Sequence, residues 1–385
     1  MPIMYNETAG MHKKGTITIG VMVARGIKSH RDKLSGILRF AAGKPNWKIV
    51  IFEETSRPSV RFDAQIILHR NALKADLANL PVVTVDQFSA ASQLMPNVFI
   101  DNTLIGKTAA DLFIQRGFAN LAAVRQTSGG DATHSDQRID AFVATAAKTG
   151  LPVSVYTPAS ASESEFLCNS SAFQKWLLDL PKPCGIFCFY DRQARDVLDS
   201  CRLALLSIPN QIAILGVDNE TDVCEVTRPT ISSIQPDFEA AGHCAAKVLD
   251  DMLSHRKVRK TYPYGILRLV ERESTQPMNA GSRIVSAAMQ LIRTTNEKPT
   301  VTGLARQLNV STALLNLRFN EILGHGPKEE IDRQQLARIQ ELLRDSSRSI
   351  TEVANLCHFA YPEELHLFFR RRTGLTPTQW RKYRA

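Results

Sequence analysis

Short apolar runs alternate along the chain with segments whose apolar residues recur at helical spacing. The run 16–23 is β-branched, the segment 31–42 repeats apolar residues every three or four positions, and the run 47–52 again has strand length. This alternation continues to about residue 271. Strands that are apolar almost throughout are typical of parallel sheets covered by helices on both faces. About ten such strands exceed one comfortable sheet, so the pattern predicts two α/β lobes, with the chain crossing between them near residues 117–121.

The pattern changes at a polar bridge that contains proline and glycine, residues 274–282, which we interpret as an interdomain linker. Beyond it no convincing strand-like run occurs, only helical segments with short breaks. The sequence therefore predicts an N-terminal tail (1–15), a two-lobed α/β domain (16–273), this linker and an all-α domain (283–385).

Two segments of the all-α domain have the pattern of a helix-turn-helix unit. In the first, a short amphipathic helix over 301–308 precedes Asn309, a residue that tolerates a left-handed turn, and a second helix over 312–323. In the second, a helix over 350–356 precedes one over about 362–372. A single pattern of this kind is a weak signal, but two at this spacing are specific.

Together these units resemble the DNA-binding domain of the AraC family. The residues that carry the resemblance are Leu304-Ala305, Val310-Ser311, Leu315, Arg318-Phe319 and Gly324, then Ile350, Val353-Ala354, Phe359, Leu365, Phe369-Arg370-Arg371, Gly374, Pro377 and Trp380-Arg381. The resemblance covers roughly the last quarter of the chain. It implies two recognition helices that enter successive major grooves on one face of double-stranded DNA.

The chain departs from this family at positions that matter for reading DNA. His358 stands in the second turn, where the family usually has glycine and a β-carbon is strained. Leu317 and Leu367 stand where the family often has arginine or another polar residue. We expect base contacts from Thr312, Ala313, Asn316, Glu363 and His366, and phosphate contacts from Arg318, Arg370, Arg371 and Arg372.

The charge distribution favours a partner that carries phosphate. The chain has a net charge of +9, and residues 281–385 hold 16 Lys and Arg against 10 Asp and Glu. About two-thirds of the positive excess thus lies in the all-α domain, where it would attract DNA. The arginine run 370–372 could instead be a solvated helix end that the helix dipole favours, so charge alone does not decide.

The α/β domain lacks the usual catalytic signatures, such as a P-loop or the G-x-S-x-G and H-E-x-x-H motifs. It offers instead polar residues that follow strands, where open α/β sheets bind ligands: Arg25, Asp191, Asp218 and Asn219, with Arg138 near a helix start. Carboxylates and a guanidinium suit hydrogen bonding to vicinal hydroxyls. A helix N-cap explains Asp191 equally well, and a surface or hinge position explains Arg25.

These segments resemble the sensor of LacI-type regulators, which is similar to periplasmic sugar-binding proteins. The resemblance is carried by Asp101-Asn102 with Gly106 and Ala109-Ala110, Arg138 with Ala141-Phe142, Tyr190-Asp191 with Ala194, Ile208-Pro209, Gly216-Val217-Asp218-Asn219, Pro229-Thr230 and Ser233-Ile234. It implies a sugar held against Arg138, Asp191 and Asp218. A sensor of this type followed, rather than preceded, by the DNA-binding domain implies a pentose or related sugar as effector.

Composition restricts the remaining possibilities. Seven scattered cysteines form no C-x-x-C pair, which is typical of reduced core residues in a cytoplasmic protein, and we expect neither a metal nor a cofactor. No apolar run approaches the roughly 18 residues that span a bilayer, so we expect no membrane partner.

We therefore expect a cytoplasmic, sugar-controlled transcription regulator that binds paired DNA half-sites as a homodimer. By resemblance it activates carbohydrate-use genes, which makes RNA polymerase a candidate partner. Two other function classes stay open. One is an α/β enzyme that acts on a sugar-like substrate and has a helical cap, and the other is a transport-linked binding protein with an unrelated helical tail.

Overall fold

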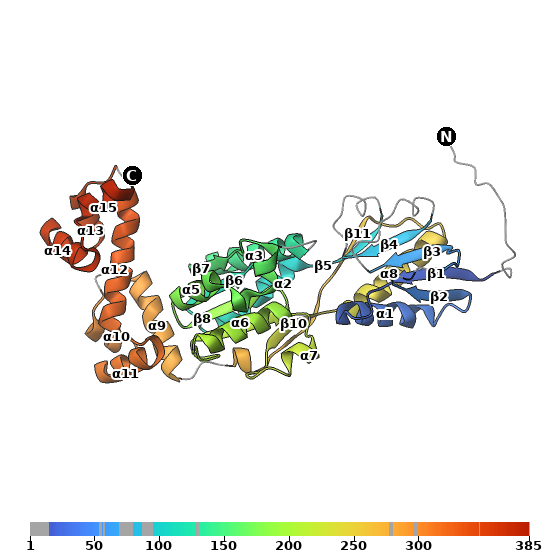
Figure 1. Ribbon diagram of the computed structural model, residues 1–385, viewed down its shortest axis with the longest axis horizontal. Helices are drawn as coiled ribbons and strands as arrows, with labels where there is room; N and C mark the ends of the chain where they lie inside the picture. The colour runs from blue at the N-terminus through green and yellow to red at the C-terminus, as the bar shows by residue number, and fades with distance from the viewer. Residues whose placement is uncertain are drawn as a thin grey trace.

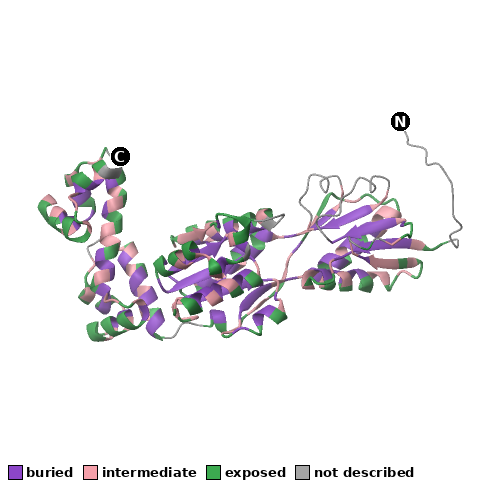
Figure 2. Cartoon of the chain, in the orientation of Figure 1, coloured by how far each residue is buried: buried purple, intermediate pink, exposed green. Residues whose placement is uncertain are grey.

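The computed structural model describes residues 15–53, 56, 58–68, 80–86, 95–127, 131–276, 280–295, 299–345 and 347–384. Figure 1 shows two α/β lobes in a row and a helical region at the end far from the first lobe. Apart from Gly15, the predicted N-terminal tail lies outside the described residues. Buried residues concentrate in the strands and on the inner faces of the helices (Figure 2).

The first lobe contains a six-stranded sheet in the order β11-β5-β4-β3-β1-β2, with every pairing parallel. Its strands are β1 (Ile17–Met22), β2 (Trp47–Phe52), β3 (Ala64–Ile67), β4 (Val82–Val85), β5 (Asn97–Ile100) and β11 (Thr261–Tyr264). The helices α1 (Lys28–Ala41) and α8 (Phe238–Leu253) pack against each other and against this sheet.

The second lobe contains a six-stranded sheet in the order β12-β10-β9-β8-β6-β7, parallel except for the β10–β12 pair. Its strands are β6 (Asn120–Val124), β7 (Val153–Tyr156), β8 (Cys184–Cys188), β9 (Ile212–Val217), β10 (Ser232–Pro236) and β12 (Ile266–Val270). Its helices are α2 (Asn102–Gln115), α3 (Asp131–Ala147), α4 (Ala161–Glu165), α5 (Ser171–Asp179), α6 (Asp191–Leu203) and α7 (Thr221–Cys224).

Alternate residues of these strands enter two different apolar clusters. Leu121 and Phe187 belong to the cluster that contains residues of α2 and α3, whereas Ala122 and Ile186 belong to the one that contains residues of α5 and α6. Because successive strand residues point to opposite faces, the second sheet is covered on both sides, as its apolar runs predicted.

The chain passes between the lobes at Asp101, Asp237 and Gly265. The backbone N–H of Asp101 donates to the carbonyl of Tyr264 (2.9 Å), and that of Asp237 donates to the carbonyl of Gly265 (3.0 Å), so the third crossing is bonded to both others. The expected crossing near residues 117–121 was wrong, since α2 already packs against α3 in the second lobe. Helical periodicity shows which face of α2 is buried but not which lobe buries it.

The predicted linker, residues 274–282, needs a correction at both ends. A helix begins at Ala280, so residues 280–282 belong to the C-terminal helical region. Ser274 and Thr275 are fully buried in the second lobe, in a short 3-10 helix over Glu273–Thr275. The Ser274 hydroxyl donates to the carbonyl of Ile214 (2.6 Å) and accepts from the backbone N–H of Ser232 (2.9 Å). Their polar side chains suggested a linker, but these hydroxyls bond to neighbouring strands of the sheet.

The C-terminal region is all-α. Its helices are α9 (Ala280–Thr294), α10 (Val301–Gln307), α11 (Thr312–Leu323), α12 (Pro327–Arg344), α13 (Ile350–Leu356), α14 (Pro362–Thr373) and α15 (Pro377–Arg384). The pairs α10–α11 and α13–α14 are the two predicted helix-turn-helix units, and their turn residues Asn309 and His358 both have φ +58°. No helix within the described ranges combines the length and hydropathy needed to cross a membrane.

The helices α1 and α8 of the first lobe lie with their backbones in close contact. A β-carbon at Gly242 would lie 1.8 Å from the Lys33 carbonyl oxygen, which is far inside van der Waals contact. We expect Gly242→Ala to separate the two helices and to lower the free energy of unfolding by about 1–3 kcal/mol. A thermal melt measures the change, and Gly43→Ala is the matched control because its β-carbon has room. Equal melting temperatures for the two variants would contradict the packing described.

Candidate ligand and DNA sites

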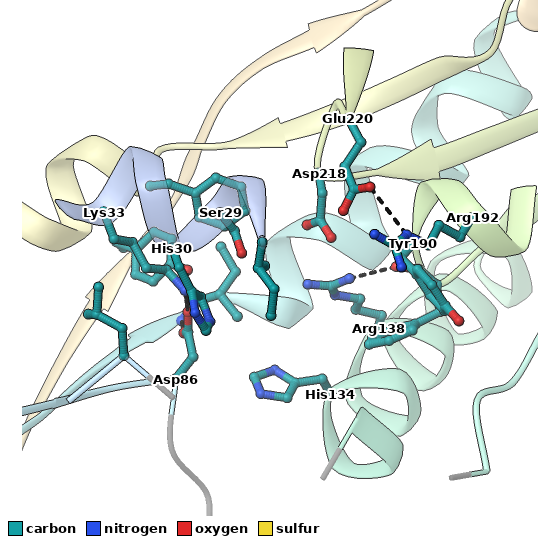
Figure 3. A pocket seen from close by; sticks show the side chains of 16 residues that line it. Ser29, His30, Lys33, Asp86, His134, Arg138, Tyr190, Arg192, Asp218 and Glu220 are labelled. Carbon is teal, nitrogen blue, oxygen red and sulfur yellow. Dashed lines mark hydrogen bonds and ion pairs between the residues drawn. The ribbon is translucent and has the colours of Figure 1, made fainter. Parts of the chain in front are cut away.

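A cavity of about 350 Å³ lies between the two lobes, within the range of about 300–1,000 Å³ usual for small-molecule sites. Figure 3 shows its polar side chains converging from both lobes. The lining residues are Ile27, Ser29, His30, Lys33, Leu68, Asp86, Ile100, His134, Arg138, Phe189, Tyr190, Arg192, Asp218, Glu220, Phe238 and Tyr264.

A buried ion pair forms the wall from the first lobe. Lys33 of α1 is 3% exposed, and its Nζ lies 2.5 Å from the carboxylate of Asp86, directly after β4. Asp86 also accepts from the Tyr264 hydroxyl (2.7 Å) and from the backbone N–H of Ile100 (2.9 Å). Burial alone would raise the pKa of Asp86, but Lys33, His134 and the Tyr264 hydroxyl outweigh this effect and hold that pKa below its usual value. The pair is therefore fixed before any ligand binds.

Arg138 of α3 forms the centre of the opposite wall. Its Nε donates to the Asn102 side-chain oxygen (2.9 Å), its Nη1 donates to the Phe189 carbonyl (2.6 Å), and its guanidinium lies 4.7 Å from the Phe189 ring centroid. Burial lowers the pKa of Arg138, an effect that the nearby Asp218 opposes. Arginine stays charged even so, because its ordinary pKa exceeds about 12. The guanidinium is thus a rigidly held cation at the cavity surface.

Asp218 lies beside Arg138 at the carboxyl end of β9. It has φ +101° and Asn219 has φ +51°, and two successive non-glycine residues in this region are strained in the way functional sites often are. Among the described residues no hydrogen bond reaches the Asp218 carboxylate, and burial raises its pKa while Arg138 lowers it. A carboxylate without internal donors and a guanidinium can together bind neighbouring hydroxyls of a ligand.

The five predicted ligand-binding residues take different positions. Asp218, at the end of a strand, and Arg138, on the helix α3, both line the cavity. Asp191 and Asn219 are buried behind the wall. Arg25 is exposed and does not line the cavity, which agrees with the alternative of a surface position.

Asp191 supports the wall rather than facing the ligand. Its carboxylate accepts from the Ser233 hydroxyl (2.6 Å) and from the backbone N–H of Glu220 (2.7 Å). It is the first residue of α6, and Tyr190 is the N-cap, so the helix-capping alternative does not hold. Asn219 likewise bonds behind the wall, where it accepts from Arg272 (2.7 Å).

Sequence reasoning missed several lining residues. Asp86 follows a predicted strand just as Asp218 does, so the same argument could have found it. Lys33 and His134 lie in helices, and Tyr264 comes from a strand near the end of the α/β region. Nothing in their local sequence indicates that distant elements bring them together.

The predicted DNA-contacting residues lie on the outer surfaces of α11 and α14. Four of the five base-contact candidates, Thr312, Ala313, Asn316 and Glu363, are exposed, and the fifth, His366, is half-buried. The arginines differ among themselves. Arg370 and Arg371 are exposed, whereas Arg318 pairs with Glu321 (2.6 Å) and Arg372 pairs with Asp332 (2.5 Å). An exposed pair such as Arg318–Glu321 contributes about 0–1 kcal/mol, so a phosphate could replace it. Asp332 is buried, so the pair that it forms with Arg372 is partly buried.

The helix α9 docks the C-terminal region on the second lobe. The Ser286 hydroxyl accepts from the Ala119 backbone N–H (3.0 Å) and donates to the Gly117 carbonyl (2.5 Å). Arg293 donates to the Asn120 side-chain oxygen (2.6 Å) and to the Ala119 carbonyl. Ala119 also belongs to the apolar cluster that contains residues of α9, α10 and α11. The first helix-turn-helix unit is therefore attached to the second lobe.

Comparison with known proteins identifies both parts of the chain. Residues 110–275 match a family described as a periplasmic binding protein-like domain, and residues 304–383 match a helix-turn-helix domain. The chain is 25% identical over 289 residues to the xylose operon regulatory protein of Haemophilus influenzae, covering 74% of each chain. It is 27% identical over 210 residues to that of Escherichia coli K12, covering 54% of this chain and 53% of the relative.

A solved structure extends the likeness across both domains. The fold matches a structure described as the xylose-binding transcription activator xylR with a TM-score of 0.61 and 22% identity, over 96% of this chain and 99% of that one. The chain thus has the fold of an AraC-type regulator with a LacI-type sensor. Its relatives are transcription regulators, and the enzyme alternative is not supported.

The buried carboxyl of Asp191 makes a pH dependence testable. Burial, reinforced by Asp218, raises its pKa from 3.8 to about 8 against the hydrogen bonds from Ser233 and Glu220. Between these two values the folded protein holds a proton that the unfolded chain releases, so we expect stability to fall as pH rises from about 4 to about 8.

The measurement is the melting temperature across that pH range for the wild type, for Asp191→Asn and for the exposed control Asp222→Asn. Asp191→Asn should flatten the decline, and Asp222→Asn should leave it in place. Parallel curves for the wild type and Asp191→Asn would show that Asp191 does not titrate in this range.

Proposed function

We propose that this transcription regulator, which joins a periplasmic binding protein-like sensor to an AraC-type helix-turn-helix domain, binds a sugar between its lobes and thereby changes its hold on DNA. The observation that carries the proposal is the interlobe cavity, where Arg138 and Asp218 present a guanidinium and a carboxylate to one small volume. A pentose is the first compound to test, because relatives of this chain are named for xylose.

Within the cavity we assign direct contacts to Arg138 and Asp218. The two groups offer donors and acceptors for adjacent hydroxyls, and the nearby ring of Phe238 offers an apolar surface for the carbons of a sugar. Asp191 and Asn219 act as positioning residues, since their hydrogen bonds hold the strand end that carries Asp218. Arg25 has no place in this assignment.

Closure of the lobes can change DNA binding only through a second subunit. In the described parts of the chain, the hydrogen bonds between the C-terminal region and the sensor go to the second lobe, at Gly117, Ala119, Asn120 and Gln211. Movement of the first lobe therefore leaves this docking unchanged within one subunit. A homodimer in which the partner contacts the first lobe would convert closure into a new spacing of the two DNA-binding domains.

We further propose that the dimer binds paired half-sites in the cytoplasm and activates transcription through contact with RNA polymerase. Paired sites suit a domain with few strong base-reading residues, because linking two weak contacts raises the overall affinity. The basic C-terminal region, with Arg370 and Arg371 free to meet phosphates, supports the DNA half of the proposal.

Replacing the Asp218 carboxylate tests the ligand site. We expect Asp218→Asn to weaken D-xylose binding by about ten- to a hundredfold, the usual loss when a hydrogen bond to a charged group is removed. Calorimetry measures the affinity, and a gel-shift titration with and without the sugar measures its effect on DNA binding. The control is Asp222→Asn, an exposed residue outside the cavity. If the wild type binds no pentose, hexose, sugar acid or polyol, the sensor proposal fails.

Removing the Arg293 contact tests the route to DNA. Arg293→Ala leaves the Asn120 side chain and the Ala119 carbonyl without this donor, a loss of about 1–3 kcal/mol at the docking surface. We expect faster hydrogen exchange in α9 and a smaller effect of the sugar on DNA binding, with sugar affinity unchanged. Arg283→Ala is the matched control, because Arg283 is an exposed arginine on the same helix. Full coupling in Arg293→Ala would exclude this docking surface from signalling.

A further inference from the structure

The two recognition helices are equivalent position by position. The helices α11 and α14 each have 12 residues and end at a glycine with left-handed φ, +75° at Gly324 and +76° at Gly374. Two inward-facing positions also match, because Leu315 and Phe319 of α11 and the equivalent leucine and phenylalanine of α14 are all fully buried. The equivalent pairs are Leu315 with Leu365, Leu317 with Leu367 and Phe319 with Phe369.

An exposed leucine stands at the middle of the outward face of each helix. Leu317 is 50% exposed and Leu367 is 54% exposed. Residues spaced three or four apart are neighbours on a helix surface, so Leu317 neighbours Ala313 and Asn320, and both of these neighbour Asn316. By the same spacing Leu367 neighbours Glu363 and Arg370, and both of these neighbour His366. These faces hold four of the five side chains from which we expect base contacts.

The surface around Leu367 is hollowed. A cavity of about 400 Å³ opens there, lined by Pro362, Glu363, His366, Leu367, Arg370 and Thr376. A single exposed leucine on a protein surface needs no explanation. Two at the same position of two recognition helices, one of them beside a hollow with basic and polar walls, point to a common apolar contact.

The major groove offers one apolar group to such a side chain. The edges of its bases present hydrogen-bond donors and acceptors, and only thymine adds a methyl group, at C5. We propose that Leu317 and Leu367 each contact a thymine methyl group and so set the base preference of their helix-turn-helix unit. This inference rests on the proposed function, since it takes DNA as the partner of both helices.

The connection between the units fixes where the two thymines lie. The helix α12 has 18 residues and therefore spans about 27 Å between the first unit and the second. Recognition helices that enter successive major grooves read positions about one turn, or roughly 10 base pairs, apart. The preferred DNA should carry two thymines at that separation, one for each leucine.

Removal of single methyl groups from DNA tests the inference. Full-length protein first selects duplexes from a random-sequence pool, and the tightest duplex is then made with each thymine replaced in turn by deoxyuridine. We expect two replacements, about one turn apart, to weaken binding by about fourfold each, the effect of burying one such group. Leu317→Ala should abolish the effect at one of these thymines, and Leu367→Ala at the other.

The two leucine variants and one control variant distinguish the possible outcomes. Both leucines are half-exposed on helices, where alanine fits without leaving a cavity, and Leu356→Ala is the control because Leu356 is 40% exposed outside these two faces. The control should keep both methyl effects. If deoxyuridine weakens no position, or if the effects persist in both leucine variants, the inference is overturned while DNA binding stands. If no duplex is selected, the proposed DNA function fails with it.

Discussion

Three chain crossings, bonded to one another, are the constraint on which the rest of the sensor depends. The third crossing accepts a backbone hydrogen bond from Asp101 at the carbonyl of Tyr264 and one from Asp237 at the carbonyl of Gly265. Asp101 and Asp237 also cap the helices α2 and α8 that follow them. The lobes are thereby held by three short segments at one edge, which leaves the carboxyl ends of both sheets facing a common cavity.

That cavity holds charges whose burial must be offset. Taking an ion out of water costs several kcal/mol unless a partner compensates, and Lys33 with Asp86 supplies such compensation within the first lobe. In the second lobe Arg138 is held by carbonyl groups, and Asp191 is buried with a pKa raised to about 8. Asp218 alone faces the cavity with no internal donor among the described residues. A ligand with adjacent hydroxyls would complete its hydrogen bonding.

The two helix-turn-helix units are attached to the sensor in different ways. The first helix-turn-helix unit shares an apolar cluster with α9 and with Ala119 of the second lobe, whereas the second unit has its own core around Phe369 and Trp380. Of the helices in the described part of the chain, only α12 contributes to both cores, through Ile331 near its start and Leu343 near its end. A displacement of the second lobe therefore reaches the first unit directly and the second through one helix.

The sequence by itself determined the elements and their chemistry. Apolar runs predicted the parallel sheets, the paired helical pattern predicted both helix-turn-helix units, and the candidate polar residues included Asp218 after a strand and Arg138 near a helix start. Only the tertiary structure showed that Lys33 lines the cavity, that the chain first crosses between the lobes at Asp101, and that Ser274 belongs to the sensor and not to a linker. The reason is physical: periodicity along the chain reveals which face of an element is buried, whereas the element that buries it is chosen by contacts between residues far apart in sequence.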